Sequence, residues 1–239
     1  MKIDELIALA GGQPTRVSKR SGVSRSTLKR VKDGTSEPTL STLREVALAL
    51  GLDITVDAGP ASDPFAAAAA RTLIDDSVPE NPGDIDVVAW LDRFERWNIN
   101  DPLTLVAEAG ILQGIHLRPG ARFMTVEPGE LADLPDMFSQ HNTQWALSGA
   151  AAATVLMGKV VNGPTVVWHD STHPGQFGFG TPLDTAEDAD VILVPAGATE
   201  LAGSYAQGPL NFVAPVQLVI DLHSLGMLTE AEFLTRGWR

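Results

Sequence analysis

Apolar residues in the first fifty positions recur at the three- and four-residue spacing of amphipathic helices, and turn residues interrupt them at short intervals. This pattern predicts four short helices. Gly11-Gly12 ends the first, and Gly22 ends the second. Ser24 is a preferred N-cap for the third, residues 25–32, which Asp33-Gly34 closes. The apolar positions that recur at helical spacing are Ile3, Leu6, Ile7 and Ala10 in the first helix and Leu40, Leu43, Val46, Ala47 and Leu50 in the fourth.

The rest of the chain mixes helical and strand-like periods. Residues 57–63, rich in small residues, Asp and Pro, predict a linker. The segments with helical spacing are 64–75, 86–97, 102–112, 148–157, 215–225 and 230–236. Strand-like runs occur at 121–126, 165–168 and 191–194. We therefore expect an α+β multidomain protein, with an all-helical N-terminal domain followed by a mixed α+β C-terminal region.

Charge is distributed unevenly between these two parts. Nine Lys/Arg and six Asp/Glu give residues 1–55 a net charge of +3, whereas eight Lys/Arg and 24 Asp/Glu give residues 56–239 a net charge of −16. The acidic part should repel nucleic acid, and the basic part need not. The absence of cysteine excludes disulfides and thiolate metal sites. We expect a cytoplasmic protein without a membrane span, because no export signal and no long apolar run is visible.

Residues 15–51, TRVSKRSGVSRSTLKRVKDGTSEPTLSTLREVALALG, resemble the Cro/XRE-type helix-turn-helix family. Val17 and Gly22-Val23 occupy the expected places in the scaffold helix and the turn. Leu28 and Val31 would anchor the recognition helix, and the apolar closing helix would pack beneath it. One departure concerns the start of the recognition helix, where the family often has glutamine and this chain has Ser-Arg-Ser-Thr at 24–27.

The polar residues of this segment suit contacts with double-stranded DNA. Seven of the nine basic residues of the N-terminal part fall within seventeen positions. Arg25 suits bidentate contact with guanine, whereas the surrounding cations suit phosphates. The DNA-binding residues we expect are Arg16, Lys19, Arg20, Ser24, Arg25, Ser26, Thr27, Lys29, Arg30 and Lys32. Because one such domain buries little DNA surface, we expect a homodimer on a palindromic operator.

A search for catalytic or metal-binding motifs in the acidic part finds none that is specific. His169, Asp170 and His173 could hold a metal only if His141 or a remote carboxylate completed the set, and a polar loop after a strand is the favoured explanation. The acidic run at 184–190 matches no calcium loop. Ser148-Gly149 lacks the frame of a nucleophile elbow. We therefore expect no enzyme, no catalytic residue, no metal site and no cofactor.

Residues 145–225 resemble the C-terminal part of AbiEi-type antitoxins and related regulators. Ser148, Gly149 and Ala152 match a helix motif that precedes paired strands in that family. Pro215, Gln217, Asp221 and Leu222 match a helix motif that follows those strands. The resemblance implies a regulator that represses its own operon and counters a nucleotidyltransferase-like toxin. The family usually carries a winged helix where this chain has a Cro-like domain, and 84–126, with Pro119-Gly120 as a wing tip, could be a remnant of it.

Gln217 and Asp221 lie four residues apart, on one face of the predicted helix. The pair could bind a toxin partner, or it could brace the fold without touching any partner. Together the two resemblances imply four parts: a Cro/XRE-like domain at 1–55, a linker with a short helix at 56–83, a helical, winged-helix-like segment at 84–130 and an AbiEi-like domain at 131–239.

The function expected is a sequence-specific DNA-binding autorepressor that is also the antitoxin of an AbiE-like toxin-antitoxin system. An alternative is a one-component regulator whose C-terminal domain senses a small molecule, with the Gly/Pro-rich loops of 158–182 framing a pocket. A third interpretation, an enzyme tethered to DNA, depends on metal binding by His169 and His173.

Overall fold

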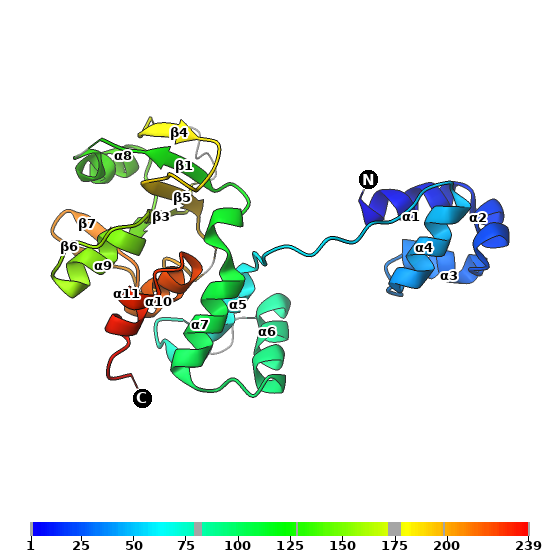
Figure 1. Ribbon diagram of the computed structural model, residues 1–239, viewed down its shortest axis with the longest axis horizontal. Coiled ribbons are helices and arrows are strands. Elements are labelled where there is room, and N and C mark those ends of the chain that lie inside the picture. The colour runs from blue at the N-terminus through cyan, green and yellow to red at the C-terminus, as the bar shows by residue number, and fades with distance from the viewer. Residues whose placement is uncertain (1, 79–82, 128, 172–177, 198, 239) are drawn as a thin grey trace. The chain divides into compact units, whose positions relative to one another are not determined.

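A computed structural model describes residues 2–78, 83–127, 129–171, 178–197 and 199–238 of the chain (Figure 1). The chain divides into two compact units, Met1–Gly59 and Pro60–Arg239, here called the N-terminal and C-terminal units. The helices of the N-terminal unit are α1 (Ile3–Gly12), α2 (Pro14–Ser21), α3 (Arg25–Lys32) and α4 (Leu40–Ala49). The predicted order of short helices in this region is confirmed.

Local capping and one apolar cluster explain the N-terminal unit. The Thr39 side chain accepts a hydrogen bond from the Thr42 amide at the start of α4, at 3.2 Å. The core of the unit consists of the buried residues Leu6, Ala10, Val17, Leu43, Val46, Ala47 and Ala49. Leu40, which was expected to pack beneath the recognition helix with the rest of the closing helix, is 55% exposed. It is the first residue of α4, and its side chain lies at the edge of the unit.

The C-terminal unit contains a mixed sheet and several helices. Its helices are α5 (Pro64–Ile74), α6 (Ile85–Arg96), α7 (Pro102–Gln113), α8 (Leu134–Gln140), α9 (Gly149–Met157), α10 (Pro215–Ser224) and α11 (Leu228–Leu234), with 3-10 turns η1 (Ile115–Leu117) and η2 (Glu130–Asp133). The strands are β1 (Arg122–Thr125), β2 (Trp145–Ser148), β3 (Thr165–His169), β4 (Thr181–Leu183), β5 (Val191–Pro195), β6 (Tyr205–Gln207) and β7 (Leu210–Phe212). Helices and a mixed sheet confirm the predicted fold class.

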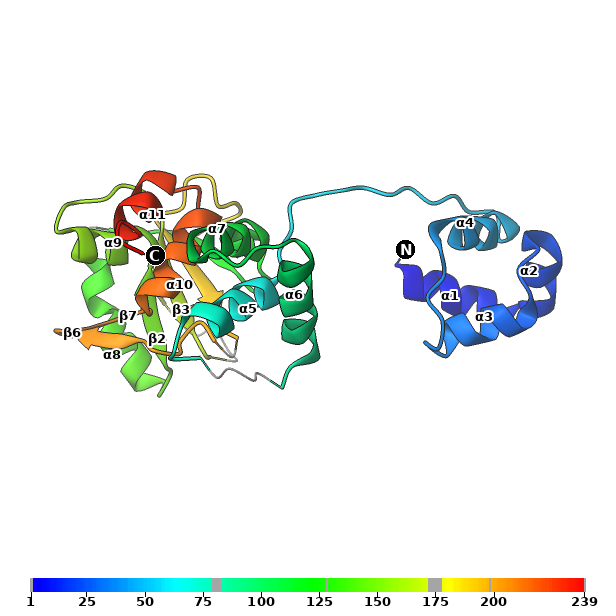
Figure 2. The ribbon, with the colours of Figure 1, turned by 90° about the horizontal axis from the view of Figure 1, so that it is seen from below.

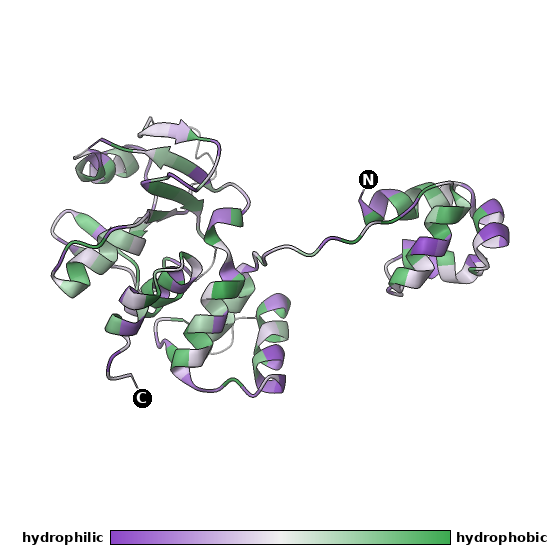
Figure 3. Cartoon of the chain, viewed as in Figure 1, coloured by the Kyte–Doolittle hydropathy of each residue, from purple (hydrophilic) through white to green (hydrophobic). Residues whose placement is uncertain are grey.

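The strands form one sheet in the order β4-β1-β5-β3-β2-β7-β6. The parallel pair β3 and β5 forms its buried centre, and β2 runs antiparallel to β3. Figure 3 shows that β5 is strongly hydrophobic, as expected for a strand that is buried on both faces. Because β3 and β5 are parallel, their carboxyl ends lie at the same edge of the sheet.

Helices cover both faces of the sheet. On one face, Phe138 of α8 stacks on Trp145 of β2, with ring centroids 5.2 Å apart. On the other face, Trp168 and Ser148 both donate hydrogen bonds to Asp221 of α10. Helices α5 and α7 pack against each other and against α10, and Figure 2 shows them together with α6. The sheet therefore lies between α8 and a layer that contains α10.

Small residues allow close packing of the helices. The five alanines of α5, residues 66–70, are all buried, which brings the α5 backbone near its neighbours. At Gly110 of α7 an added Cβ would lie 2.4 Å from His223 Cβ and 2.5 Å from the Ile220 carbonyl oxygen of α10. Only glycine fits at this crossing, since real Cβ contacts are not so short.

The structure differs from the expected division of residues 56–130. Helix α5 was expected in a linker, but its alanines lie in the same buried core as Trp90 and Phe94 of α6. The segment 84–130 is not a separate winged helix, because β1 pairs with β4 and β5 in the main sheet. Gly120, expected at a wing tip, lies against the Pro195 ring at the end of β5. No helix among the described ranges is long and apolar enough to cross a membrane.

Candidate nucleic-acid interface

The turn between α2 and α3 determines how α3 is presented. Gly22 has a φ of 73°, in the left-handed region that favours glycine. Two residues later the Ser24 hydroxyl accepts a hydrogen bond from the Thr27 amide at 3.1 Å, which makes Ser24 the N-cap. The predicted cap and turn are thus both present. They place Arg25 at the first position of α3.

Helix α3 has an apolar side and a basic side. Leu28 packs against the core of the N-terminal unit, and Val31 lines the same small apolar space as Leu43. No residue of α3 is fully buried, and the opposite side is open to solvent. Arg25 and Lys29, four residues apart, lie on this open side. The basic side is therefore presented by a helix that the core holds from behind.

The hydroxyl groups at the start of α3 form a cluster. Ser24 Oγ lies 2.8 Å from Ser26 Oγ and 2.9 Å from Thr27 Oγ1. These contacts fix the three side chains that were expected to contact DNA beside Arg25. Ser24 and Ser26 are exposed, whereas Thr27 is half-buried. The cluster can donate hydroxyl hydrogen bonds to phosphate oxygens while still capping the helix.

The expected cations fall into two groups. Arg20 donates a hydrogen bond from Nη1 to the Ala49 carbonyl oxygen at the end of α4, at 3.2 Å. Lys32 lies along α1, because an added Cβ at Gly11 would be 3.0 Å from its Cδ. These two side chains are directed toward other helices of their own unit. Arg16 donates a hydrogen bond from Nη1 to Oε1 of Gln13, three residues earlier in the chain, at 2.9 Å. The other four expected cations, Lys19, Arg25, Lys29 and Arg30, are exposed and have no hydrogen-bond or ion-pair partner within the described residues.

Gln217 and Asp221, expected to contact a protein partner, are both fully buried on α10. Their side chains therefore cannot form a contact surface, and the partner-binding expectation is corrected. Asp221 Oδ2 accepts hydrogen bonds from Ser148 Oγ at 2.5 Å and from Trp168 Nε1 at 2.8 Å. Asp221 Oδ1 accepts from Gln217 Nε2 at 2.7 Å and from Gln113 Nε2 at 3.1 Å. The pair braces the fold, as the alternative interpretation held.

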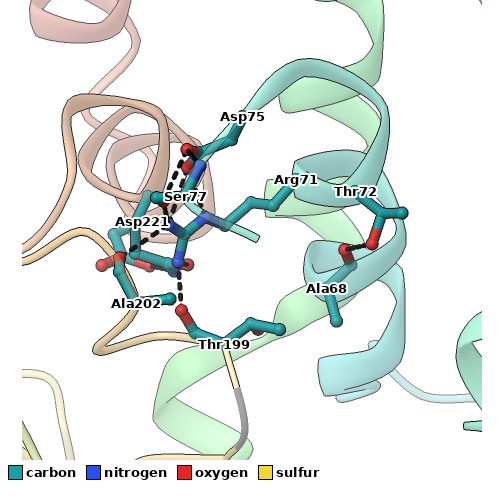
Figure 4. Close-up of polar contacts among 9 residues, drawn as sticks. Ala68, Arg71, Thr72, Asp75, Ser77, Thr199, Ala202 and Asp221 are labelled. Carbon is teal, nitrogen blue, oxygen red and sulfur yellow. Dashed lines mark hydrogen bonds and ion pairs between the residues drawn. The ribbon is translucent and has the colours of Figure 1, made fainter. Parts of the chain in front are cut away.

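A buried arginine extends this network (Figure 4). Arg71 of α5 donates from Nη1 to Gln217 Oε1 at 3.3 Å, and from Nε to Asp75 Oδ2 at 2.8 Å. It also donates to the carbonyl oxygens of Thr199 and Ala202. The guanidinium thereby joins α5, α10 and the segment after β5. Sequence reasoning missed Arg71, and its only signal was a lone cation that ends an alanine run.

Burial changes the acidity of two groups in the C-terminal unit. Burial raises the pKa of Asp221 to about 6, although its four hydrogen bonds oppose this shift. Burial lowers the pKa of His169 to about 4, although the nearby negative charge of Asp170 acts to raise it. His169 is fully buried in β3 and stacks against Phe138. A buried imidazole of this kind is neutral at physiological pH.

The metal hypothesis depends on His169, Asp170 and His173. His173 lies outside the described residues. Among those that are described, no group of three His, Asp or Glu side chains is arranged to hold a metal ion. In the acidic run, Asp190 Oδ2 accepts a hydrogen bond from the Val126 amide at 3.1 Å, while Asp184, Glu187 and Asp188 are exposed.

Comparison with known proteins gives one match, which covers the N-terminal unit. Residues 3–56 match the family model of the helix-turn-helix domain HTH_3. No curated protein and no solved structure matches the chain. The match agrees with the geometry of α2, the turn at Gly22 and α3. The N-terminal unit is a helix-turn-helix domain, which supports a DNA-binding transcriptional regulator.

Proposed function

We propose that this protein is a sequence-specific DNA-binding repressor whose helix α3 enters the major groove of its operator. The main support for this proposal is the solvent-exposed side of α3, where Arg25, Lys29 and Arg30 have no partner within the described residues. An arginine at the start of a recognition helix can bond to guanine O6 and N7. The acidic C-terminal unit repels DNA, so binding relies on the N-terminal unit.

A second copy of the chain would supply the second half-site contact. A groove of about 500 Å³ lies between α1, α4 and residues 52–57 of the N-terminal unit. Three apolar side chains around it are open to solvent: Ile3 is 56%, Leu40 55% and Val56 67% exposed. Pairing of two copies through this groove would cover the apolar surface. A palindromic operator, whose half-sites lie about one DNA turn apart, would take one α3 helix from each copy.

The narrower proposal is that the protein represses its own operon and is the antitoxin of an AbiE-like system. Its support is the resemblance of residues 145–225, whose two motifs meet where Ser148 bonds to Asp221. The net charge of −16 on residues 56–239 would complement a basic surface on a nucleotidyltransferase-like toxin. Because Gln217 and Asp221 are buried, that contact would use exposed acidic residues instead.

Two experiments test these proposals separately. Selection of duplexes from a random DNA pool by the full chain should yield a palindromic sequence that binds far more tightly than random DNA. Equal binding of selected and random duplexes would contradict the repressor proposal. For the antitoxin proposal, the adjacent open reading frame is expressed alone and with the chain. Growth arrest that the chain relieves is expected, and a verified neighbour that causes no arrest would rule out the antitoxin role.

A further inference from the structure

A cavity of about 610 Å³ lies in the C-terminal unit at the carboxyl end of β3 and the start of β2. This volume is within the range of small-molecule sites in proteins. The stacked rings of Phe138 and Trp145 form part of its wall, and Leu201 adds a further apolar contact. Of the 158–182 segment expected to frame a pocket, Asp170 lines this cavity.

Among the lining residues that the structure describes, one carries a charge, the carboxylate of Asp170. Asp170 Oδ1 accepts a hydrogen bond from the Gln144 amide at 2.9 Å, and the Asp170 amide donates to the Gln144 carbonyl oxygen at 3.1 Å. These two bonds hold the carboxylate beside the end of the sheet where β2 begins and β3 ends. Oδ2 has no partner within the described residues, so it is available to accept from a ligand.

The other polar side chains of the cavity are neutral. Gln144, Ser204 and Asn211 have no side-chain hydrogen bond within the described residues. Amide and hydroxyl groups both donate and accept. None of the described lining residues is basic, so a phosphate or carboxylate ligand would meet Asp170 without a compensating cation. The lining is therefore suited to a neutral ligand that is rich in hydroxyl groups.

We propose that this cavity binds a small neutral molecule with adjacent hydroxyl groups, and that Asp170 Oδ2 accepts from one of them. Gln144, Ser204 and Asn211 supply the remaining donors and acceptors. Adjacent hydroxyl groups occur in free sugars and in the ribose of nucleosides, and both satisfy the same set of contacts. The site lies in the C-terminal unit and does not depend on the proposed DNA contacts of α3.

Saturation-transfer NMR of the full chain with D-glucose, D-ribose and adenosine tests this site. Binding of a sugar alone, of adenosine alone or of both supports the proposal and identifies the source of the hydroxyl pair. 2′-Deoxyadenosine, which lacks the pair, should bind at least tenfold more weakly than adenosine. Binding by none of the three, or equal binding of adenosine and its deoxy analogue, would overturn the proposal.

The contribution of the cavity is tested with variants. Asp170→Asn keeps an acceptor for the Gln144 amide but removes the charged acceptor, so the affinity should fall about tenfold or more. Asp188→Asn, an exposed acid outside the cavity, is the matched control and should bind as the wild type does. Should Asp170→Asn fail to fold, Ser204→Trp is the second test, because an indole at this exposed lining position would take up part of the space that a ligand needs. Unchanged binding in the folded variant would overturn the assignment.

Discussion

The Ser148 hydroxyl donates a 2.5 Å hydrogen bond to the buried carboxylate of Asp221, a residue that lies 73 positions later in the chain. Trp168, Gln113 and Gln217 complete the set of donors to the same carboxylate. One side chain thereby links α7, α10 and two strands of the sheet. Four donors on two oxygens satisfy a group that would otherwise be costly to bury.

Asp221→Asn should lower the free energy of unfolding of the C-terminal unit by about 1–3 kcal/mol. The new amide group would face donors, leaving at least one buried N–H or O–H without an acceptor. All five tryptophans lie in the C-terminal unit, so tryptophan fluorescence during urea unfolding reports on this unit alone. Asp92→Asn, at an exposed position of α6, is the control and should leave the midpoint unchanged.

The pH dependence of stability should contain two opposing contributions. The pKa of Asp221 is raised from 3.8 to about 6, so its contribution is fully present below about pH 4 and is lost as the pH rises through 6. The pKa of His169 is lowered from 6.5 to about 4, so its contribution is present above 6.5 and is lost as the pH falls through 4. Asp221→Asn removes the first of these contributions and keeps the second. Stability of this variant should therefore rise more steeply between pH 4 and 6.5 than that of the wild type, and parallel curves would contradict these shifts.

Arg25→Ala and Lys29→Ala should affect DNA binding in different ways. The loss of Arg25 should cost about 1–3 kcal/mol on the selected operator and relax the preference at one base pair. The loss of Lys29 should weaken all sequences alike and reduce the salt slope by about one. Fluorescence anisotropy at several salt concentrations distinguishes the two effects. Arg96→Ala removes one exposed positive charge from the C-terminal unit and should change neither quantity.

Alanine substitutions at the neighbouring residues Lys19 and Arg20 should distinguish an effect on DNA binding from an effect on the stability of the N-terminal unit. Arg20 bonds to the carbonyl oxygen of Ala49 at the end of α4, so Arg20→Ala should destabilise the N-terminal unit by about 0.3–1 kcal/mol. Lys19→Ala should leave stability unchanged and weaken DNA binding in a salt-dependent manner. Hydrogen exchange of α4 amides measures the first effect. A larger loss of stability in Lys19→Ala than in Arg20→Ala would contradict the assignment.

Leu40→Glu should prevent pairing of two copies, because the charge would be buried in the apolar groove between α1 and α4. Sedimentation equilibrium should show a dimer for the wild type and a monomer for the variant. Since Leu40 is 55% exposed within one chain, the unit should still fold. Leu73→Glu, at an exposed leucine of the C-terminal unit, controls for the added charge.

The N-terminal unit could be predicted from the sequence because its determinants are local. Ser24 lies one residue before the helix that it caps, and Gly22 occupies the turn itself. The buried network could not be predicted, since Arg71, Gln113 and Asp221 are brought together only by the packing of α5, α7 and α10. Strand β2 was missed because its four residues precede an alanine-rich helix without a break.

The cavity could not be predicted for a similar reason. Gln144 and Asp170 meet because β2 pairs with β3, and Ser204 arrives from the segment after β5. Each of these residues alone is an ordinary polar residue of a loop. The spacing of Gln217 and Asp221 predicts that they share one face of a helix, as they do on α10, but spacing does not reveal whether that face points toward a core or toward solvent.

The crossing of α7 and α10 at Gly110 offers a genetic means of distinguishing the functions of the two units. Any side chain at this position would force the helix axes apart, whereas the apolar core of the N-terminal unit contains no residue of either helix. A Gly110→Val allele would damage the C-terminal unit selectively and spare the DNA-contacting residues. Comparing this allele with an Arg25→Ala allele would show, in living cells, which phenotype depends on the N-terminal unit and which on the C-terminal unit.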